Sequence, residues 1–250
     1  MVTRADCEEL TQLWNRSAPF DQISSELLSE KLWGDSDFEE SLCLTIEDAK
    51  RLIGIGAAVV RKRDDGDMGY VKLIAIDPNH RGRGHGRQLL ETLEDRLAKE
   101  GVTSIRLGES APNYLTPGVD VRYTTAMLLF ESCGYKRIGE TYNLTARLTE
   151  LDLETDASCD SLRQSGIDVR RFAEGDSASL QQLLDAHWPA WTAELSKARQ
   201  NTPPSVHLAC KEGRVIGFAA FDSNNLNTGW FGPMGTDPDC RGLGIGAILL

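Results

Sequence analysis

The feature that most constrains this 250-residue chain is an eleven-residue pattern that occurs twice. The two copies are residues 76–86, IDPNHRGRGHG, and residues 236–246, TDPDCRGLGIG. They share an aspartate, a proline, an arginine and three glycines at matching positions. A separation of about 160 residues is too long for a solenoid repeat and is the size of a domain. The pattern therefore predicts a tandem duplication of one domain.

Hydrophobic periodicity predicts two helices followed by three strands before each copy. In the first region we expect helices at 4–16 and 24–33, strands at 41–46, 52–60 and 70–76 with a hairpin turn at 64–67, a helix at 86–100, a strand at 102–107, a loop at 108–121, a helix at 122–132, and strands at 135–138 and 142–148. In the second we expect a strand at 167–172, helices at 176–188 and 191–198, and strands at 206–210, 215–221 and 230–236.

This order predicts an α/β (α+β) fold, in which a mixed, mostly antiparallel sheet is flanked by helices. Residues 149–166 are polar and acidic without a clear period, which is typical of a linker. We expect a first domain at 1–149, a linker at 150–166, and the N-terminal part of a second domain at 167–250, where the chain stops shortly after the second loop.

Composition excludes several classes of function. A net charge of −11 disfavours nucleic-acid binding, which depends on clustered Lys and Arg, and weakly favours a cationic substrate such as an amine. No apolar run approaches the ~20 residues of a membrane span, and the N-terminus lacks an apolar signal segment, so a cytoplasmic location is expected. The six cysteines form no CxxC pair, and the four histidines do not pair with cysteines at ligand spacing, so neither disulfides nor a metal are expected.

A strand that ends in a glycine-rich turn and opens a helix is an anion-binding site, because the first N–H groups of the helix have no intrahelical partners. Glycines allow close backbone approach, while Arg81, Arg83 and Arg87 add donors suited to phosphate. A Walker loop would need Lys-Ser/Thr after its last glycine, and a dinucleotide fingerprint would need Gly-x-Gly-x-x-Gly; neither is present. The aspartates at the second position of the two copies, Asp77 and Asp237, are expected to cap the turns.

The motif that is present is Arg-x-x-Gly-x-Gly, and with the element order it resembles the GNAT superfamily of N-acetyltransferases, in a tandem form. The resemblance implies acetyl-CoA as the acyl-donor cosubstrate. It implies a pyrophosphate site at Arg81, Gly82, Arg83, Gly84, His85, Gly86 and Arg87, and in the second copy at Arg241, Gly242, Gly244 and Gly246. It also implies that the preceding strand splays from its neighbour and binds the pantetheine arm, through Leu73, Ile74, Ala75 and Ile76.

The chain departs from the family pattern on the helix at 122–132. The family's tyrosine that protonates the CoA thiolate is replaced by Phe130, which cannot donate a proton. Candidates for proton transfer are Glu109, at the end of the strand after the loop helix, then Tyr114 and Tyr123. A solvated carboxylate at Glu109 and a packed loop aromatic at Tyr114 are the competing structural interpretations.

The resemblance implies direct attack of a primary amine on the thioester, with a small molecule or a peptide as acceptor. The alternative is a non-catalytic acyl-CoA-binding or protein-interaction module, which the phenylalanine at position 130 and the incomplete second copy favour. A nucleotide binder that uses the same loop is a third hypothesis. The oligomeric state is left open.

Overall fold

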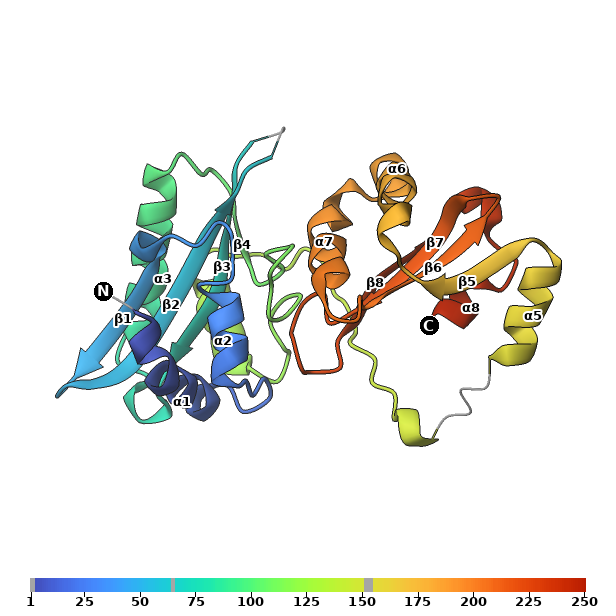
Figure 1. The fold of residues 1–250 in the computed structure, drawn as a ribbon. Helices are drawn as coiled ribbons and strands as arrows, with labels where there is room; N and C mark the ends of the chain where they lie inside the picture. The colour runs from blue at the N-terminus through green and yellow to red at the C-terminus, as the bar shows by residue number, and fades with distance from the viewer. Residues whose placement is uncertain (1–2, 64–65, 151–154) are drawn as a thin grey trace. The chain divides into compact units, whose positions relative to one another are not determined.

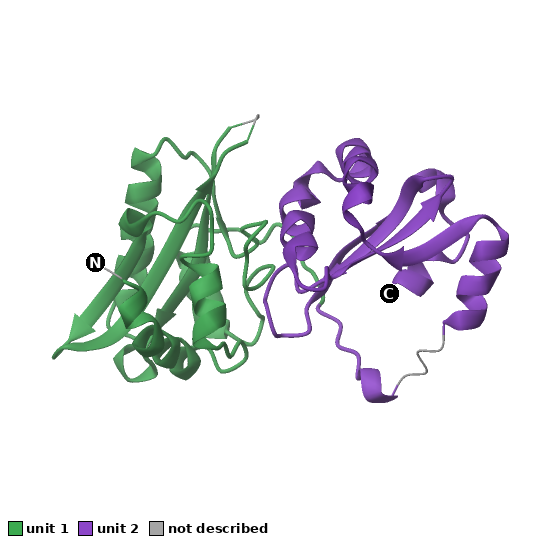
Figure 2. Cartoon of the chain, in the orientation of Figure 1, with its two compact units in different colours: residues 1–142 green, residues 143–250 purple. Residues whose placement is uncertain are grey.

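The computed structural model describes residues 3–63, 66–150 and 155–250. Asp64 and Asp65 of the expected hairpin turn, and residues 151–154 of the expected linker, lie outside the described residues. The chain divides into two compact units, residues 1–142 and 143–250 (Figure 2). Each unit is described by itself.

The first unit is a four-stranded sheet with helices on both faces (Figure 1). Its elements are α1 (Cys7–Ser17), α2 (Ser25–Lys31), β1 (Cys43–Asp48), β2 (Arg51–Arg61), β3 (Met68–Ile76), α3 (His85–Lys99), β4 (Ile105–Leu107) and α4 (Thr124–Ser132). The strand order is β1-β2-β3-β4; the first three strands are antiparallel, and β4 pairs parallel to β3.

Two apolar clusters hold the helices to this sheet. Leucines of α1 and α2 pack with Ala57 and Leu73 on one face. Leucines of α3 and Phe130 of α4 pack with Ala58 and Val71 on the other. Each helix therefore buries one apolar stripe, as its periodicity predicts.

The second unit repeats this architecture through its own loop. Its elements are α5 (Asp156–Gln164), β5 (Ile167–Arg171), α6 (Ser177–His187), α7 (Thr192–Gln200), β6 (Val206–Lys211), β7 (Arg214–Phe221), β8 (Phe231–Thr236) and α8 (Ile245–Leu249). The strands are antiparallel in the order β5-β6-β7-β8. Helices α6 and α7 cover one face, and α5 and α8 cover the other. The prediction of a mixed, mostly antiparallel sheet flanked by helices is confirmed.

Two local predictions were wrong. Residues 135–138 and 142–148 form no strand, because no other strand of the described chain pairs with them, and Ile138, Tyr142 and Leu144 are exposed. Within the polar segment 149–166, where no helix was predicted, α5 is present. It buries Leu162 beside Ile167 in the core of the second unit. One buried leucine gives too weak a period to be recognised in sequence.

All six cysteines are free thiols. Over the residues that the structure describes, no helix is long and apolar enough to span a bilayer. The same residues contain no cluster of three or more histidine, cysteine or acidic side chains that would hold a metal ion.

Candidate functional site

The loop between β3 and α3 has the geometry of an anion site. Asp77 caps the turn by accepting the Asn79 N–H at 3.0 Å, as predicted. Gly82 and Gly84 have φ of 73° and 87°, in the left-handed region that favours glycine. Gln88 donates its N–H to the carbonyl of Gly84 at 3.0 Å and so makes the first hydrogen bond of the α3 ladder. The N–H groups of residues 85–87 thus have no acceptor within the helix.

Strand β3 contains a bulge that changes which backbone groups face its open edge. Val71 pairs with Ala58, and Leu73 pairs with Ala57, so Lys72 is an extra residue. Before the bulge, the Val71 carbonyl faces β4, since it accepts the Gly108 N–H at 3.0 Å.

After the bulge the odd-numbered residues face β2 instead, because Asp77 donates its N–H to Ile53 at 2.8 Å. Backbone groups alternate along a strand. The N–H and C=O of Ile74 and Ile76 therefore point to the edge that β4 leaves open, since β4 pairs with β3 only over residues 69–71.

A cavity of about 570 Å³ lies along this edge. Its walls come from the connection after α1, from β3, from the glycine loop and from α4: residues 17–21, 71–72 and 74–76, 80–82 and 84–87, 116, 118–120 and 122–126, with Phe130 at 6% exposure. The segment before α2 and the start of α4 thus lie beside the strand and loop that sequence reasoning singled out.

The structure places the sequence candidates as follows. Ile74, Ala75, Ile76, Arg81, Gly82, Gly84, His85, Gly86, Arg87 and Tyr123 line the cavity. Of the described candidates in this unit, Leu73, Arg83, Glu109 and Tyr114 are not among its lining residues. Leu73 packs under α1 and α2. Arg83 donates to the Asn79 carbonyl at 3.3 Å, and Glu109 forms an ion pair of 2.6 Å with Arg106.

Two of the loop arginines also hold the loop in place. Arg81 donates to the carbonyl of Ile76 at 3.0 Å and to that of Ser17, at the end of α1, at 2.7 Å. Arg87 donates to Ser132 Oγ of α4 at 2.8 Å. Both side chains therefore fix the elements around the cavity in addition to carrying positive charge toward it.

A hydrogen-bonded Tyr–Asp pair lies on the wall formed by the connection after α1. The Tyr123 hydroxyl accepts the Phe20 N–H at 3.0 Å and is hydrogen-bonded to the Asp21 carboxylate. Burial raises the pKa of Asp21, although the hydrogen bond from Tyr123 lowers it. Burial, together with this hydrogen bond, raises the pKa of Tyr123 to about 12. Tyr123 is thus a poor acid, and Asp21 is a stronger base than a solvated aspartate.

Behind the bulge lies a buried ionic network. Lys72 donates to Asp35 and, at 2.7 Å, to the Lys31 carbonyl. Arg61 donates to both oxygens of Asp35, at 2.6 and 2.7 Å. Burial alone would raise the pKa of Asp35, but these cations lower it to about 2. Burial lowers the pKa of Lys72 to about 8, against the opposing effect of Asp35.

Sequence reasoning missed Asp21 and Lys72. Asp21 stands in a turn with no motif around it, so its place beside Tyr123 depends on the fold. Lys72 carried a usable signal: it is a single charge inside the apolar run 70–76, and such charges are paired when they are buried.

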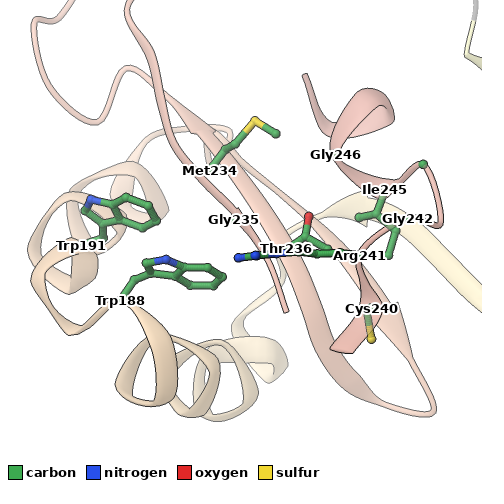
Figure 3. Close-up of a pocket in the computed structure, with 11 residues that line it drawn as sticks. Trp188, Trp191, Met234, Gly235, Thr236, Cys240, Arg241, Gly242, Ile245 and Gly246 are labelled. Atoms are coloured by element: carbon green, nitrogen blue, oxygen red, sulfur yellow. The ribbon is translucent and has the colours of Figure 1, made fainter. Parts of the chain in front are cut away.

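The second unit has a related cavity of about 610 Å³ (Figure 3). Its loop repeats the geometry of the first: Asp237 accepts the Asp239 N–H at 3.0 Å, and Gly242 and Gly244 have φ of 82° and 81°. Arg241, Gly242, Gly244 and Gly246 all line this cavity.

One wall of the second cavity consists of two stacked tryptophans, Trp188 and Trp191, with ring centroids 5.5 Å apart. Trp188 follows α6 as its C-cap, in the position that Ala18 has after α1. Its ring lies so close to Gly235 that a Cβ there would approach it to 2.9 Å. Ala75 stands at the equivalent position of the first unit. An indole in the second unit thus fills space that lies beside small side chains in the first.

Solved structures share this fold. This chain resembles a GCN5-related glucosamine N-acetyltransferase region of a fungal multi-domain GH3 β-N-acetylglucosaminidase. The match covers 99% of this chain and 32% of that one, with a TM-score of 0.78 and 18% identity. A GCN5-related N-acetyltransferase from Sphaerobacter thermophilus matches over 99% of this chain and 78% of its own, with a TM-score of 0.64 and 18% identity. The fold is that of the GCN5-related N-acetyltransferases.

Sequence comparison gives the family. The model of the acetyltransferase (GNAT) family matches residues 7–116 and 174–250, one region in each unit. The chain belongs to the acetyltransferase (GNAT) family, and the predicted tandem resemblance is confirmed.

Two curated relatives are mycothiol acetyltransferases. The one from Thermomonospora curvata is 28% identical over 187 residues, 70% of this chain and 57% of that protein. The one from Stackebrandtia nassauensis is 24% identical over 261 residues, 98% of this chain and 79% of that protein. The chain thus spans little more than half the length of the first relative.

Proposed function

We propose that the chain is an acetyl-CoA-dependent N-acyltransferase that moves an acetyl group to a primary amine, and that the chemistry takes place in the first unit. The observation that supports this most is the content of the 570 Å³ cavity. It brings together the open edge of β3, the N-terminal N–H groups of α3, and the Asp21–Tyr123 pair.

The residues of the first unit fit acetyl-CoA. The free N–H groups of residues 85–87, with Arg81 and Arg87, offer donors to a pyrophosphate. The edge groups of Ile74 and Ile76 offer hydrogen bonds to an amide-bearing pantetheine arm, which would lie along residues 74–76. Arg83 adds positive charge near the loop, and Leu73 supports the strand from beneath. When bound, acetyl-CoA supplies the activated acetyl thioester.

Asp21 is our candidate for proton transfer from the acceptor. An amine enters as an ammonium ion and must lose a proton before its nitrogen attacks a carbonyl carbon. Asp21 accepts that proton, directly or through water, and releases it to solvent. In the overall reaction the C–N bond forms and the C–S bond breaks, while the second proton of the nitrogen passes to sulfur. This assignment replaces Glu109, whose carboxylate pairs with Arg106.

Charge on the cavity wall supports a cationic acceptor. Asp21 lies on the wall that Tyr123 completes, where the neighbouring Asp120 is paired with Arg122 at 2.6 Å, while the loop wall carries Arg81 and Arg87. The relatives are named for mycothiol, so the amines to be tested include its deacetylated form together with small amines, amino sugars and peptide N-termini.

For the second unit we propose CoA binding without acetyl transfer. Arg241, Gly242, Gly244 and Gly246 repeat the loop of the first unit. The specific observation in favour of a non-catalytic role is Trp188, whose ring covers Gly235, whereas Ala18 and Ala75 stand at the equivalent positions on the wall of the first cavity.

The test is acetyl-CoA turnover on this amine panel, followed by release of the CoA thiol, together with calorimetric binding of CoA to the full chain. Turnover on at least one amine supports the proposal. Binding without turnover on any amine favours a non-catalytic CoA-binding module. If the chain does not bind CoA, both are wrong, and ATP that competes better than CoA would favour a nucleotide binder.

A further inference from the structure

The bulge of β3 contains one residue with an unusual environment. Lys72 is both the extra residue of the bulge and the first residue beyond the last β3–β4 pair. Its side chain is 2% exposed and is held by Asp35 and by the Lys31 carbonyl. The bulge is also where the strand inverts its backbone alternation, so the side chain of Lys72 is anchored at the point that decides which N–H groups face the cavity.

The ionic network around Lys72 is balanced in charge. The surrounding ionisable groups are Glu30 and Lys31 of α2, Asp35 and Asp37 of the following loop, and Arg61 of β2. Three cations therefore meet three anions. A buried network of this kind is weak evidence for stability alone, since well-packed apolar residues are often as stable. Its position on the bulge gives it a second role.

The second unit keeps the bulge by different means. In β8 one extra residue lies between Phe231 and Met234, because Phe221 pairs with Phe231 and Ala219 with Met234. Gly232 stands nine residues before Arg241, as Lys72 does before Arg81. Gly232 has φ of 127°, a conformation that favours glycine, whereas Lys72 is not among the residues with positive φ. The bulge is thus retained in both units, by backbone geometry in one and by a side-chain anchor in the other.

We propose that Lys72 is a positioning residue: its ion pair with Asp35 holds the bulge so that the Ile74 N–H points into the cavity and donates to the acetyl carbonyl of the acyl donor. Lys72 acts through the backbone and does not itself contact the acetyl group. A fixed donor at the carbonyl oxygen polarises the thioester and stabilises the negative charge that develops on attack. The inference depends on the proposed function, because it needs acetyl-CoA in this cavity.

The test compares acetyl-CoA with S-ethyl-CoA, which lacks only the carbonyl oxygen. Affinities are measured by calorimetry on the full chain, and the amide signal of Ile74 is followed by NMR with ¹⁵N-isoleucine labelling, so that the first unit is observed separately. We expect wild type to prefer acetyl-CoA by about fivefold, the value of one net hydrogen bond, and the Ile74 amide to shift only with acetyl-CoA.

Three variants separate positioning from general stability. Lys72→Met removes the charge and should reduce the preference to about onefold while S-ethyl-CoA still binds. Lys72→Arg keeps the charge and should retain the preference. Gly139→Ala, in an open and exposed position, is the control for handling and should change neither affinity.

The pH dependence of the acetyl-CoA preference in wild type tests the role of Lys72 even if the Lys72→Met variant does not fold. Because Lys72 loses its proton as pH rises through about 8, the preference for acetyl-CoA should fall above that pH. In Lys72→Arg it should not fall, since arginine stays charged. A wild-type preference that is absent, or constant from pH 6 to 10, overturns the proposal, as does a folded Lys72→Met with wild-type preference. If neither analogue binds wild type, the proposed function itself is wrong.

Discussion

The substitution Gly84→Ala tests the anion loop most directly. Gly84 is the N-cap of α3, with φ of 87° and ψ of −9°. A Cβ built there would meet no described atom within 4 Å, so the substitution adds backbone strain and no collision. Left-handed backbone costs an L-residue about 1–2 kcal/mol. The loop either bears this strain or relaxes, and relaxation turns the N–H groups of residues 85–87 away from the cavity.

The strain sets the size of the effect on binding. If CoA binds only to the native loop conformation and the loop of the unbound variant relaxes, CoA binding must restore the strained conformation. The Kd for CoA at the first unit should then rise by about 5- to 30-fold, the equivalent of 1–2 kcal/mol. If the loop does not relax, the free energy of unfolding falls by the same amount instead. Calorimetry and a thermal melt together measure both outcomes.

Matched variants make the interpretation specific. Asparagine tolerates the left-handed region better than alanine, so Gly84→Asn should lose less. Gly139→Ala should have no effect. Gly244→Ala has the same geometry in the second unit, with φ of 81°, and should weaken CoA binding there alone. If Gly84→Ala leaves both CoA affinity and melting temperature unchanged, or if Gly84→Asn is as damaging, the strain argument is refuted.

Three further predictions concern the cavity wall and the ionic network. Asp35→Asn should lower the free energy of unfolding, measured in urea, by about 3–5 kcal/mol, because it leaves buried cations uncompensated. In wild type the stabilisation by Asp35, whose pKa is lowered from 3.8 to about 2, is complete above pH 3.8 and is lost as pH falls toward 2. The variant should lack this loss of stability in acid, and a wild type that lacks it too would contradict the prediction. Tyr123→Phe removes the hydrogen bond that lowers the pKa of Asp21, so the acid limb of a kcat/KM profile should move to higher pH; an unmoved limb would exclude Asp21 as the base. Ala18→Trp places an indole at the position that Trp188 has in the second unit. It should abolish acetyl transfer while CoA still binds in the second unit, and full transferase activity in the variant would contradict this.

Local sequence patterns were enough to predict most helices and strands and the conformation of the glycine-rich loop. Helix α3 was predicted from its leucine stripe and Gly101, and both ends agree within one residue. The glycines at 82 and 84 adopt the positive φ that the motif implied. These features depend on neighbours within a few residues, so the sequence contains them directly.

The proton-transfer candidates show where local reasoning ends. Glu109 was favoured because it ends a strand near the loop, but its carboxylate turns to Arg106, three residues away. Tyr123 does line the cavity, yet its hydroxyl is engaged by Phe20 and Asp21, more than one hundred residues earlier in the chain. Side-chain direction at a strand end, and contacts between distant loops, are set by tertiary structure and have no periodicity to detect.

The two bulges also determine where the chain tolerates a change in length. Nine positions separate Lys72 from Arg81 and Gly232 from Arg241, and one residue added or lost within either interval would reverse which backbone groups meet a ligand. The hairpin just before each bulge has no such constraint: it runs from Arg61 to Met68 in one unit and from Phe221 to Phe231 in the other. The two units differ in the length of that hairpin and have the same spacing beyond the bulge. Insertions for labels or reporters should accordingly be placed in the β2–β3 or β7–β8 turn.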